Sequence, residues 1–280
     1  MNKTNIEWAK NPDGSQGYTW NPITGCLNHI DGLCKGGGFP CYAYRLANTR
    51  LKDRYLVNRD IAPTPNYPYR DPIIDSMNIV YGWKQAYSDP FYPRFWSGRL
   101  DEKFGEWGDG KGIFVCDMAD LFGIGVPEKW TWDVLEKIDR LGYEHHRFYL
   151  LTKQPQNLHR FSPFPRNCYV GVTVCNQSMH NEAIACMAGI KAKIKYISYE
   201  PLLRPISATH AYDLSEIQWV ILGSQTKPTV MPKIEWVEEI VKAADRAGAK
   251  VFLKNNLKGY DLSFQVHGLR QEMPDHYQGK

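Results

Sequence analysis

The chain has 280 residues, a formal net charge of +4 and an apolar fraction of 43%, which together indicate a soluble globular protein of one large domain or two smaller ones. The opening Met1–Trp8 lacks the apolar core of a secretory signal, and no apolar run approaches the roughly 18 residues that a membrane-spanning helix needs. We therefore expect a cytoplasmic protein without a membrane segment. The small net charge gives no global electrostatic argument for nucleic-acid binding.

The first 25 residues predict an extended lead-in, in which Ile6–Trp8 and Tyr18–Pro22 are separated by the turn-forming Asn11–Gly14. Three of the seven cysteines follow within a short, glycine-rich segment: Cys26, Cys34 and Cys41. Glycine lets a backbone bend around a small object. Because cytoplasmic thiols stay reduced, this crowding favours zinc or an iron–sulfur cluster over a disulfide.

The region after the third cysteine has two parts. Tyr42–Val57 contains no proline or glycine and predicts one helix that starts at the last cysteine. Residues 58–100 are rich in proline and aromatic residues, and they predict a long ordered insertion with one short helix near Ile73–Tyr87. Loops of this length are typical of lids or substrate walls.

From residue 112 the chain becomes regular, with short apolar runs alternating with helical patterns. The runs are 112–116, 147–151, 168–174, 195–199, 219–223 and 250–254, and the clearest helical patterns are 127–141, 179–188 and 234–247. Continuous apolar strands that alternate with helices indicate right-handed βαβ units and a parallel sheet. We expect an α/β fold of one domain, a complete or partial TIM-type barrel, with a doubly wound open sheet as the alternative. The tail after residue 259 is irregular and has no predicted role.

Polar residues follow the predicted strands at the edge where parallel α/β folds carry their chemistry. The candidates are Asp117, Asp120, Lys153, Asn176 and Glu200. Each has a structural alternative: Asp120 and Asn176 are typical helix caps, and Lys153 and Glu200 could pair across the mouth of the barrel. The remaining cysteines, Cys116, Cys168, Cys175 and Cys186, have no comparable spacing, and we predict that they are core or incidental residues.

Several motifs carry a family resemblance that runs in order from about residue 5 to 257. They are Thr19–Cys26, Cys41–Ala43, Asp117–Phe122, Leu150–Lys153, Val170–Val174 and Ser198–Leu203. In these motifs the chain resembles the phage Gp37/Gp68 family, also called DUF5131, which is similar to radical S-adenosylmethionine (SAM) enzymes. The resemblance implies an enzyme in which three cysteines hold a [4Fe–4S] cluster inside a partial barrel.

The resemblance also implies roles for the strand-end residues. With three thiolates instead of four, one iron stays open for SAM, and cleavage of SAM would give a radical that takes hydrogen from the substrate. Asp117 and Asp120 would then lie where related enzymes contact the SAM amino group, and Lys153, Asn176 and Glu200 would contact its ribose or carboxylate. The seven- and six-residue gaps between the cysteines are longer than the usual three and two. The substrate, any catalytic residue, and the need for an electron donor or partner protein stay open.

Two other functions are compatible with the sequence. Zinc could bind the three cysteines with His29 as the fourth ligand, which would give a non-catalytic metal module. Alternatively, the insertion could bind or modify nucleic acid, because arginines alternate there with aromatic residues that suit stacking and phosphate contacts. Those residues are Arg59, Arg70, Arg94 and Arg99 with Tyr67, Tyr69, Tyr92 and Trp96.

Overall fold

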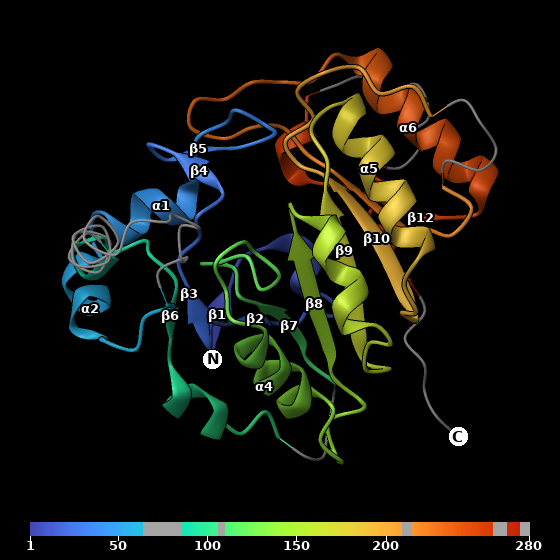
Figure 1. Cartoon of the computed structure of the whole chain (residues 1–280). Helices are drawn as coiled ribbons and strands as arrows, with labels where there is room; N and C mark the ends of the chain where they lie inside the picture. The colour runs from blue at the N-terminus through green and yellow to red at the C-terminus, as the bar shows by residue number, and fades with distance from the viewer. Residues whose placement is uncertain (64–85, 106–109, 209–213, 260–267, 275–280) are drawn as a thin grey trace.

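The computed structural model describes residues 1–63, 86–105, 110–208, 214–259 and 268–274. Its centre is an open eight-stranded sheet in the order β1-β2-β7-β8-β9-β10-β11-β12. Strand β1 pairs antiparallel with β2, whereas every later neighbour in the sheet pairs in parallel. The architecture is therefore an α/β fold with a partial TIM-type barrel, as the strand and helix pattern predicts (Figure 1).

The regular elements agree closely with the sequence pattern from residue 112 onward. The strands of the main sheet are β1 (Asn2–Thr4), β2 (Gly17–Trp20), β7 (Gly112–Val115), β8 (Arg147–Thr152), β9 (Cys168–Thr173), β10 (Ile194–Tyr199), β11 (Trp219–Leu222) and β12 (Lys250–Leu253). The three long helices are α4 (Glu128–Ile138), α5 (Gln177–Ala188) and α6 (Ile234–Ala247). Short 3-10 helices are η1 (Glu7–Ala9), η2 (Ser97–Asp101), η3 (Pro155–Phe161) and η4 (Asn255–Leu257). The six predicted strands and three predicted helices of this region are confirmed.

Alternate residues of each strand face opposite sides of the sheet. One set packs against the helices and forms the larger core, which includes Val170 of β9, Leu222 of β11, Met187 of α5 and Val241 of α6. Figure 1 shows α5 and α6 on one side of the sheet, with α1, α2 and the β4–β5 hairpin on the other. The opposite set of strand residues faces the interior of the barrel, where the aromatic cluster and the candidate site lie.

The amino-terminal segment fills the bottom of the barrel. Trp8, on η1, is 2% exposed, and its ring centroid lies 4.9 Å from Phe114 and 5.5 Å from Tyr149. The same cluster includes Tyr196 and Trp219 from later strands. The prediction of an extended Ile6–Trp8 is wrong: a 3-10 turn places this indole among inward-facing aromatic side chains, and the gain from burying it decides the local conformation.

The predicted single helix over Tyr42–Val57 is also wrong, because it is divided into α1 (Tyr42–Ala47) and α2 (Lys52–Val57). The side chains of Asn48 and Thr49 bond to the carbonyls of Tyr44 and Arg45, and they end the first helix. Two antiparallel strands, β4 (His29–Ile30) and β5 (Leu33–Cys34), precede these helices, and β3 (Ile23–Thr24) pairs with β6 (Arg94–Phe95). Most of the helix predicted near Ile73–Tyr87 lies outside the described residues.

The segment 268–274, part of the predicted irregular tail, covers the edge of β12. The amide of Leu253 donates to the carbonyl of Arg270 at 2.7 Å, and the amide of Glu272 donates to the carbonyl of Val251 at 2.9 Å. These bonds satisfy backbone groups that an edge strand would otherwise expose. None of the helices in the described ranges is long and apolar enough to cross a bilayer.

Candidate active site

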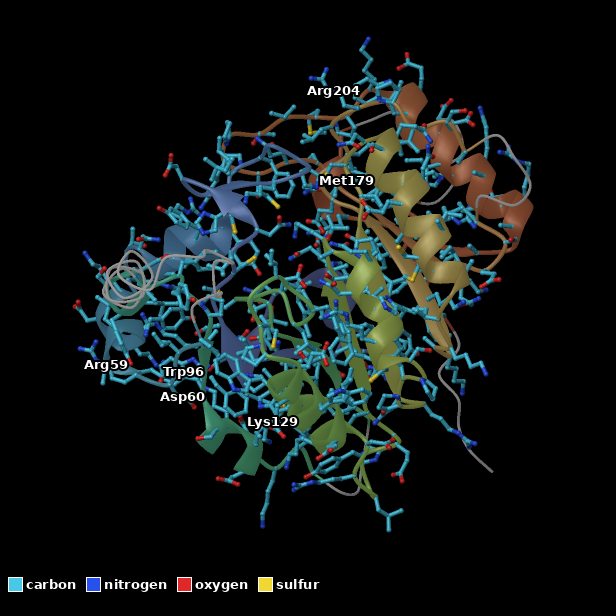
Figure 2. All side chains as sticks on the ribbon, viewed as in Figure 1. Arg59, Asp60, Trp96, Lys129, Met179 and Arg204 are labelled. Atoms are coloured by element: carbon cyan, nitrogen blue, oxygen red, sulfur yellow. The ribbon has the colours of Figure 1, made fainter. Side chains whose placement is uncertain are left out.

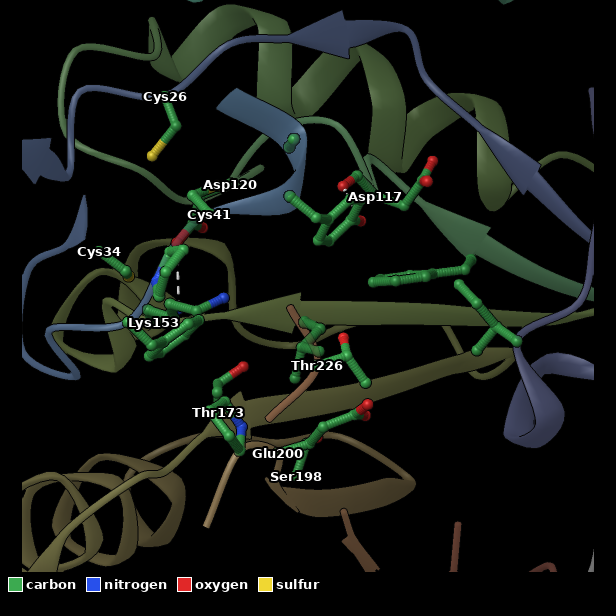
Figure 3. Close-up of a pocket in the computed structure, with 18 of the residues that line it drawn as sticks. Cys26, Cys34, Cys41, Asp117, Asp120, Lys153, Thr173, Ser198, Glu200 and Thr226 are labelled. Atoms are coloured by element: carbon green, nitrogen blue, oxygen red, sulfur yellow. Dashed lines mark hydrogen bonds between the residues drawn. The ribbon is translucent and has the colours of Figure 1, made fainter. Parts of the chain in front are cut away.

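A pocket of about 560 Å³ opens at the carboxyl ends of the parallel strands. Its lining includes all three cysteines of the glycine-rich segment and four of the five strand-end candidates, namely Cys26, Cys34, Cys41, Asp117, Asp120, Lys153 and Glu200. Figure 3 shows the cysteines at one side of the pocket with Asp120 and Lys153, and Ser198, Glu200 and Thr226 at the other. The fold thus brings distant parts of the chain to one site, as the rule for parallel sheets predicts.

The first cysteine is fixed by a close backbone approach at Gly25. The Gly25 amide donates to Met118 O, and the Cys26 amide donates to Phe91 O, both at 2.9 Å. Gly25 has φ +90°, and a Cβ at this position would lie 2.4 Å from the carbonyl oxygen of Tyr92. Only glycine fits between these two segments, and its position sets Cys26 beside the loop that follows β7.

The other two cysteines lie on the hairpin and at the start of α1. Cys34 is 7% exposed and ends β5, where its amide donates to Phe39 O at 2.9 Å. Cys41 is the N-cap of α1, and its amide donates to Gly32 O at 2.8 Å. Backbone bonds therefore hold all three thiols against one pocket wall.

The thiols differ in how far their surroundings disfavour ionisation. Burial, reinforced by the Asp120 carboxylate, raises the pKa of Cys26 to about 12. Burial also raises the pKa of Cys34, although Lys153 opposes this effect. Both thiols therefore carry protons at neutral pH unless a metal replaces them, since metal binding to a thiol releases its proton.

Lys153 provides the positive charge of this wall. Burial alone would lower its pKa, but the negative charges of the Cys34 thiolate, the Asp120 carboxylate and the Cys41 thiolate, each when ionised, more than offset that effect, so the pKa is raised and the side chain stays cationic. Its ammonium also lies 5.8 Å from the ring centroid of Phe39. Lys153 is thus placed to stabilise thiolates or a bound anionic group.

Asp120 clamps two strand ends together. One carboxylate oxygen accepts from the Thr152 hydroxyl at 2.7 Å and the Phe122 amide at 3.2 Å, and the other accepts from the Lys153 amide at 3.0 Å. The side chain is not a helix cap. Its three bonds hold the loop after β7 against the end of β8, which positions Lys153.

We expect Asp120→Asn to destabilise the folded chain by about 2 kcal/mol, because an amide cannot accept every bond that the carboxylate accepts and hydrogen bonds to charged groups are worth about 1.5–3 kcal/mol. Urea denaturation followed by circular dichroism measures the change. The exposed Asp139 is a matched control, and Asp139→Asn should alter stability by less than about 0.5 kcal/mol. Equal stability of the wild type and Asp120→Asn would contradict the clamp.

Asp117 and Glu200 lie on different walls and have different partners. Asp117 accepts from Asn21 Nδ2 at 2.5 Å, and burial raises the pKa of its carboxyl despite hydrogen bonds from Asn21 and Thr19. Glu200 is bound by the ammonium of Lys254, which also lies 3.5 Å from Glu7. The sequence offered an ion pair between Lys153 and Glu200 as a structural alternative. In the structure Glu200 forms its ion pair with Lys254 instead.

Asn176 lies apart from the other candidates and does not line the main pocket. Its side chain caps α5 by accepting from the Met179 amide at 3.0 Å, and it donates to the carbonyl of Gly36 at 3.0 Å. The helix-cap alternative is thus confirmed, with the additional effect that Asn176 holds the cysteine hairpin against α5.

Sequence reasoning missed two residues of this region. Lys254 directly follows β12 as Lys153 follows β8, so the same strand-end rule would have found it. Cys175 is 1% exposed, as a core position requires, yet it lines a second cavity together with Cys34 and Gly36–Gly38. A Cβ on Gly37 would lie 3.3 Å from the Cys175 sulfur. No sequence spacing indicates this proximity, because Cys175 reaches the hairpin only through the folded sheet.

As the side chains stand, no three His, Cys, Asp or Glu residues within the described ranges are grouped closely enough to hold one metal ion. In an iron–sulfur cluster each cysteine binds a different iron, so the three sulfurs lie further apart than the ligands of a single ion.

The fold and site define a partial parallel barrel with a cysteine-lined, charged pocket at its carboxyl-end face. The sequence model of the family described as "Protein of unknown function (DUF5131)" matches residues 3–260, and the chain belongs to this family. The comparisons with curated proteins and with solved structures found no match.

Proposed function

We propose that this chain is a radical SAM enzyme, with a [4Fe–4S] cluster on Cys26, Cys34 and Cys41. The observation that carries the proposal is that these cysteines, from the segment between β3 and α1, line the same strand-end pocket as Asp117, Lys153 and Glu200, from three different strand ends. Three thiolates suit a cluster that keeps one iron open, and the barrel face is where parallel α/β folds bind cofactors.

The donor set fits the cluster. Thiolates are the usual ligands of iron–sulfur clusters, and the segment that follows Cys34 contains Gly36, Gly37 and Gly38, which line a cavity together with Cys34. When bound and reduced, the cluster would supply the electron that splits SAM into methionine and a radical. Lys153 would offset the negative charge of the thiolates.

The charge of the pocket fits SAM as well. Four carboxylates line it, from Glu7, Asp117, Asp120 and Glu200, against the two ammonium groups of Lys153 and Lys254. The excess of two negative charges favours a cation, and SAM carries a sulfonium and an ammonium group. Asp117 is the carboxylate that we expect to receive one of these charges, since Asp120 is already engaged by three hydrogen bonds and Glu200 by the ammonium of Lys254.

The aromatic floor would protect a reactive intermediate from water. Trp8 and Phe114 line the pocket from below and belong to the buried cluster that fills the barrel. Exclusion of water and orientation of the substrate are what a protein contributes to cofactor-based radical chemistry.

The test is anaerobic reconstitution with iron and sulfide, followed by reduction in the presence of SAM. We expect about four irons per chain, and methionine and 5′-deoxyadenosine as products. The control omits the reductant and should yield neither product. A reconstituted chain that binds iron but neither binds nor cleaves SAM would contradict the proposed enzyme activity. A chain that binds no iron would contradict the proposed cluster.

Zinc on the same cysteines is the second candidate, because His29 also lines the pocket. However, His29 Nδ1 accepts from the Gly32 amide at 3.3 Å, and its ring packs 4.9 Å from Tyr44 and 5.4 Å from Phe91. These contacts favour a packing role. Stoichiometric zinc after anaerobic purification, released by His29→Ala, would support zinc over the cluster.

A further inference from the structure

A group of exposed basic side chains lies on and between α1 and α2. Between Tyr42 and Val57 there are four basic side chains, Arg45, Arg50, Lys52 and Arg54, and one acidic side chain, Asp53. This segment therefore has a net charge of +3. The basic side chains are all exposed, and in the part of the chain that the structure describes none of them forms an ion pair.

Two of these basic side chains, Arg50 and Arg54, lie near Tyr55 together with Arg99. Burial raises the pKa of Tyr55 to about 12, while Arg99, Arg54 and Arg50 are near enough to oppose that rise. Arg99 itself lies 4.1 Å from the ring centroid of Trp96. Unpaired cations that gather on one surface are the electrostatic footprint of a polyanion site.

This basic face begins at the rim of the pocket. Helix α1 starts immediately after Cys41, and its first residue, Tyr42, lines the pocket and donates from its hydroxyl to the carbonyl of Asp117. Arg45 is three positions further on, so it lies on the same side of α1 as Tyr42. A ligand held by the arginines would therefore extend to the pocket entrance.

The pocket and the face have opposite charge, which restricts the ligand that fits both. The pocket has an excess of two carboxylates, so it would repel a phosphate that entered it. Its walls include the rings of Phe39, Tyr42 and Phe91, which suit an uncharged flat base. A polynucleotide meets both conditions, because its phosphates can stay outside while one base turns into the pocket.

Within the insertion that the sequence suggested as a nucleic-acid surface, one of the arginines, Arg94, has a structural role. Arg94 is fully buried, and its guanidinium donates to the carbonyls of Asn58, Ala86 and Asp89 at 2.6–3.2 Å. This arginine joins parts of the insertion and is unavailable to phosphate. The basic side chains on and between α1 and α2 are exposed, and Arg59 of the insertion lies at the same edge of the molecule (Figure 2).

We propose that the substrate of the pocket is a nucleic acid strand, held by its phosphates on the α1–α2 face with one base presented to the pocket. This inference rests on the proposed function for the chemistry at the base. The binding itself depends on the α1–α2 arginines and not on the cluster.

The test compares the anaerobically reconstituted protein with two triple variants. One carries Arg45→Gln, Arg50→Gln and Arg54→Gln, and the control carries Lys129→Gln, Arg140→Gln and Lys242→Gln, which remove the same charge from exposed positions on or beside α4 and α6. Figure 2 shows Lys129 well apart from Arg59. Fluorescence anisotropy with labelled single-stranded DNA, duplex DNA and RNA of one sequence is measured from about 50 to 200 mM salt.

We expect the wild type and the control to bind at least one of the three nucleic acids with a salt-dependent affinity. The arginine variant should bind roughly tenfold more weakly and show a salt slope reduced by about two to three, since each lost phosphate contact removes about 0.7–0.9 from the slope. Equal weakening in the control, an absence of salt-dependent binding, or tighter binding to phosphatidylserine vesicles or polyglutamate would overturn the proposal.

The two proposals fail separately. Iron content and SAM cleavage without an added substrate are measured on the same three proteins, and we expect them to be equal. SAM cleavage without nucleic-acid binding would contradict the nucleic-acid substrate, while the proposed radical SAM activity would stand. Nucleic-acid binding by a chain that holds no iron would contradict the proposed radical SAM activity, while the proposed nucleic-acid surface on α1 and α2 would stand.

Discussion

Cys34→Ser should remove most of the iron that the wild-type chain retains after anaerobic reconstitution, from about four irons to fewer than about one. Cys34 is the most deeply buried of the three pocket cysteines, and it is held in place by β5. A serine hydroxyl is a poor ligand for iron at neutral pH, and a cluster with two thiolates has lost one of its three anchors. Iron and sulfide analysis and the visible absorption of the cluster measure the loss.

Cys175→Ser is the sharpest control for this prediction. Cys175 lies beside the same hairpin but lines the second cavity, not the main pocket. We expect this variant to keep the iron content of the wild type. Iron loss as large as that of Cys34→Ser would mean that four thiolates hold the cluster. No iron would then be open to SAM, and the proposed function would fail while the cluster remained.

Trp8→Ala should lower the free energy of unfolding by about 3–5 kcal/mol, the usual cost of removing a large aromatic side chain from a core. Trp8 lies against Phe114, Tyr149, Tyr196 and Trp219, with ring-centroid distances from 4.9 to 6.3 Å. Side chains from four strands of the sheet, β7, β8, β10 and β11, therefore pack against this one indole ring. Urea denaturation followed by circular dichroism measures the change.

Trp132→Ala is the matched control, because Trp132 is 39% exposed on α4 and its ring centroid lies 5.2 Å from that of Phe161. We expect it to cost clearly less than Trp8→Ala, since less apolar surface leaves water when Trp132 is buried. Similar losses in the two variants would show that the barrel does not depend on its aromatic floor.

The sequence predicted the strands well because they carry a strong signal. Runs such as Phe148–Leu151 and Val170–Val174 are apolar without interruption, which is typical of strands covered on both faces. The strand-end rule then brought Asp117, Lys153 and Glu200 to one pocket without any knowledge of the loops. The sequence also predicted that the three cysteines would lie at this pocket, because they are crowded together shortly after the first parallel strand.

The errors have a common physical cause, since each depends on contacts between residues far apart in the chain. Trp8 forms a 3-10 turn because strands more than a hundred residues away provide its aromatic partners. The position of Cys175 beside the hairpin and the burial of Arg94 are set in the same way. The break between α1 and α2 is the exception, since Asn48 and Thr49 bond locally and their side chains could have indicated it.

The contact between Glu7 and the end of β12 has a consequence for biosynthesis. Glu7 Oε1 accepts from the Asn255 amide at 2.9 Å, across a sequence separation of 248 positions. At a translation rate of about 5–20 residues per second, roughly 10–50 s pass between the synthesis of the two partners. During that interval the nascent chain already contains all three pocket cysteines but lacks Lys254 and the last strand. The complete pocket therefore forms only after this late contact, and we expect cofactor insertion to follow translation and not to accompany it.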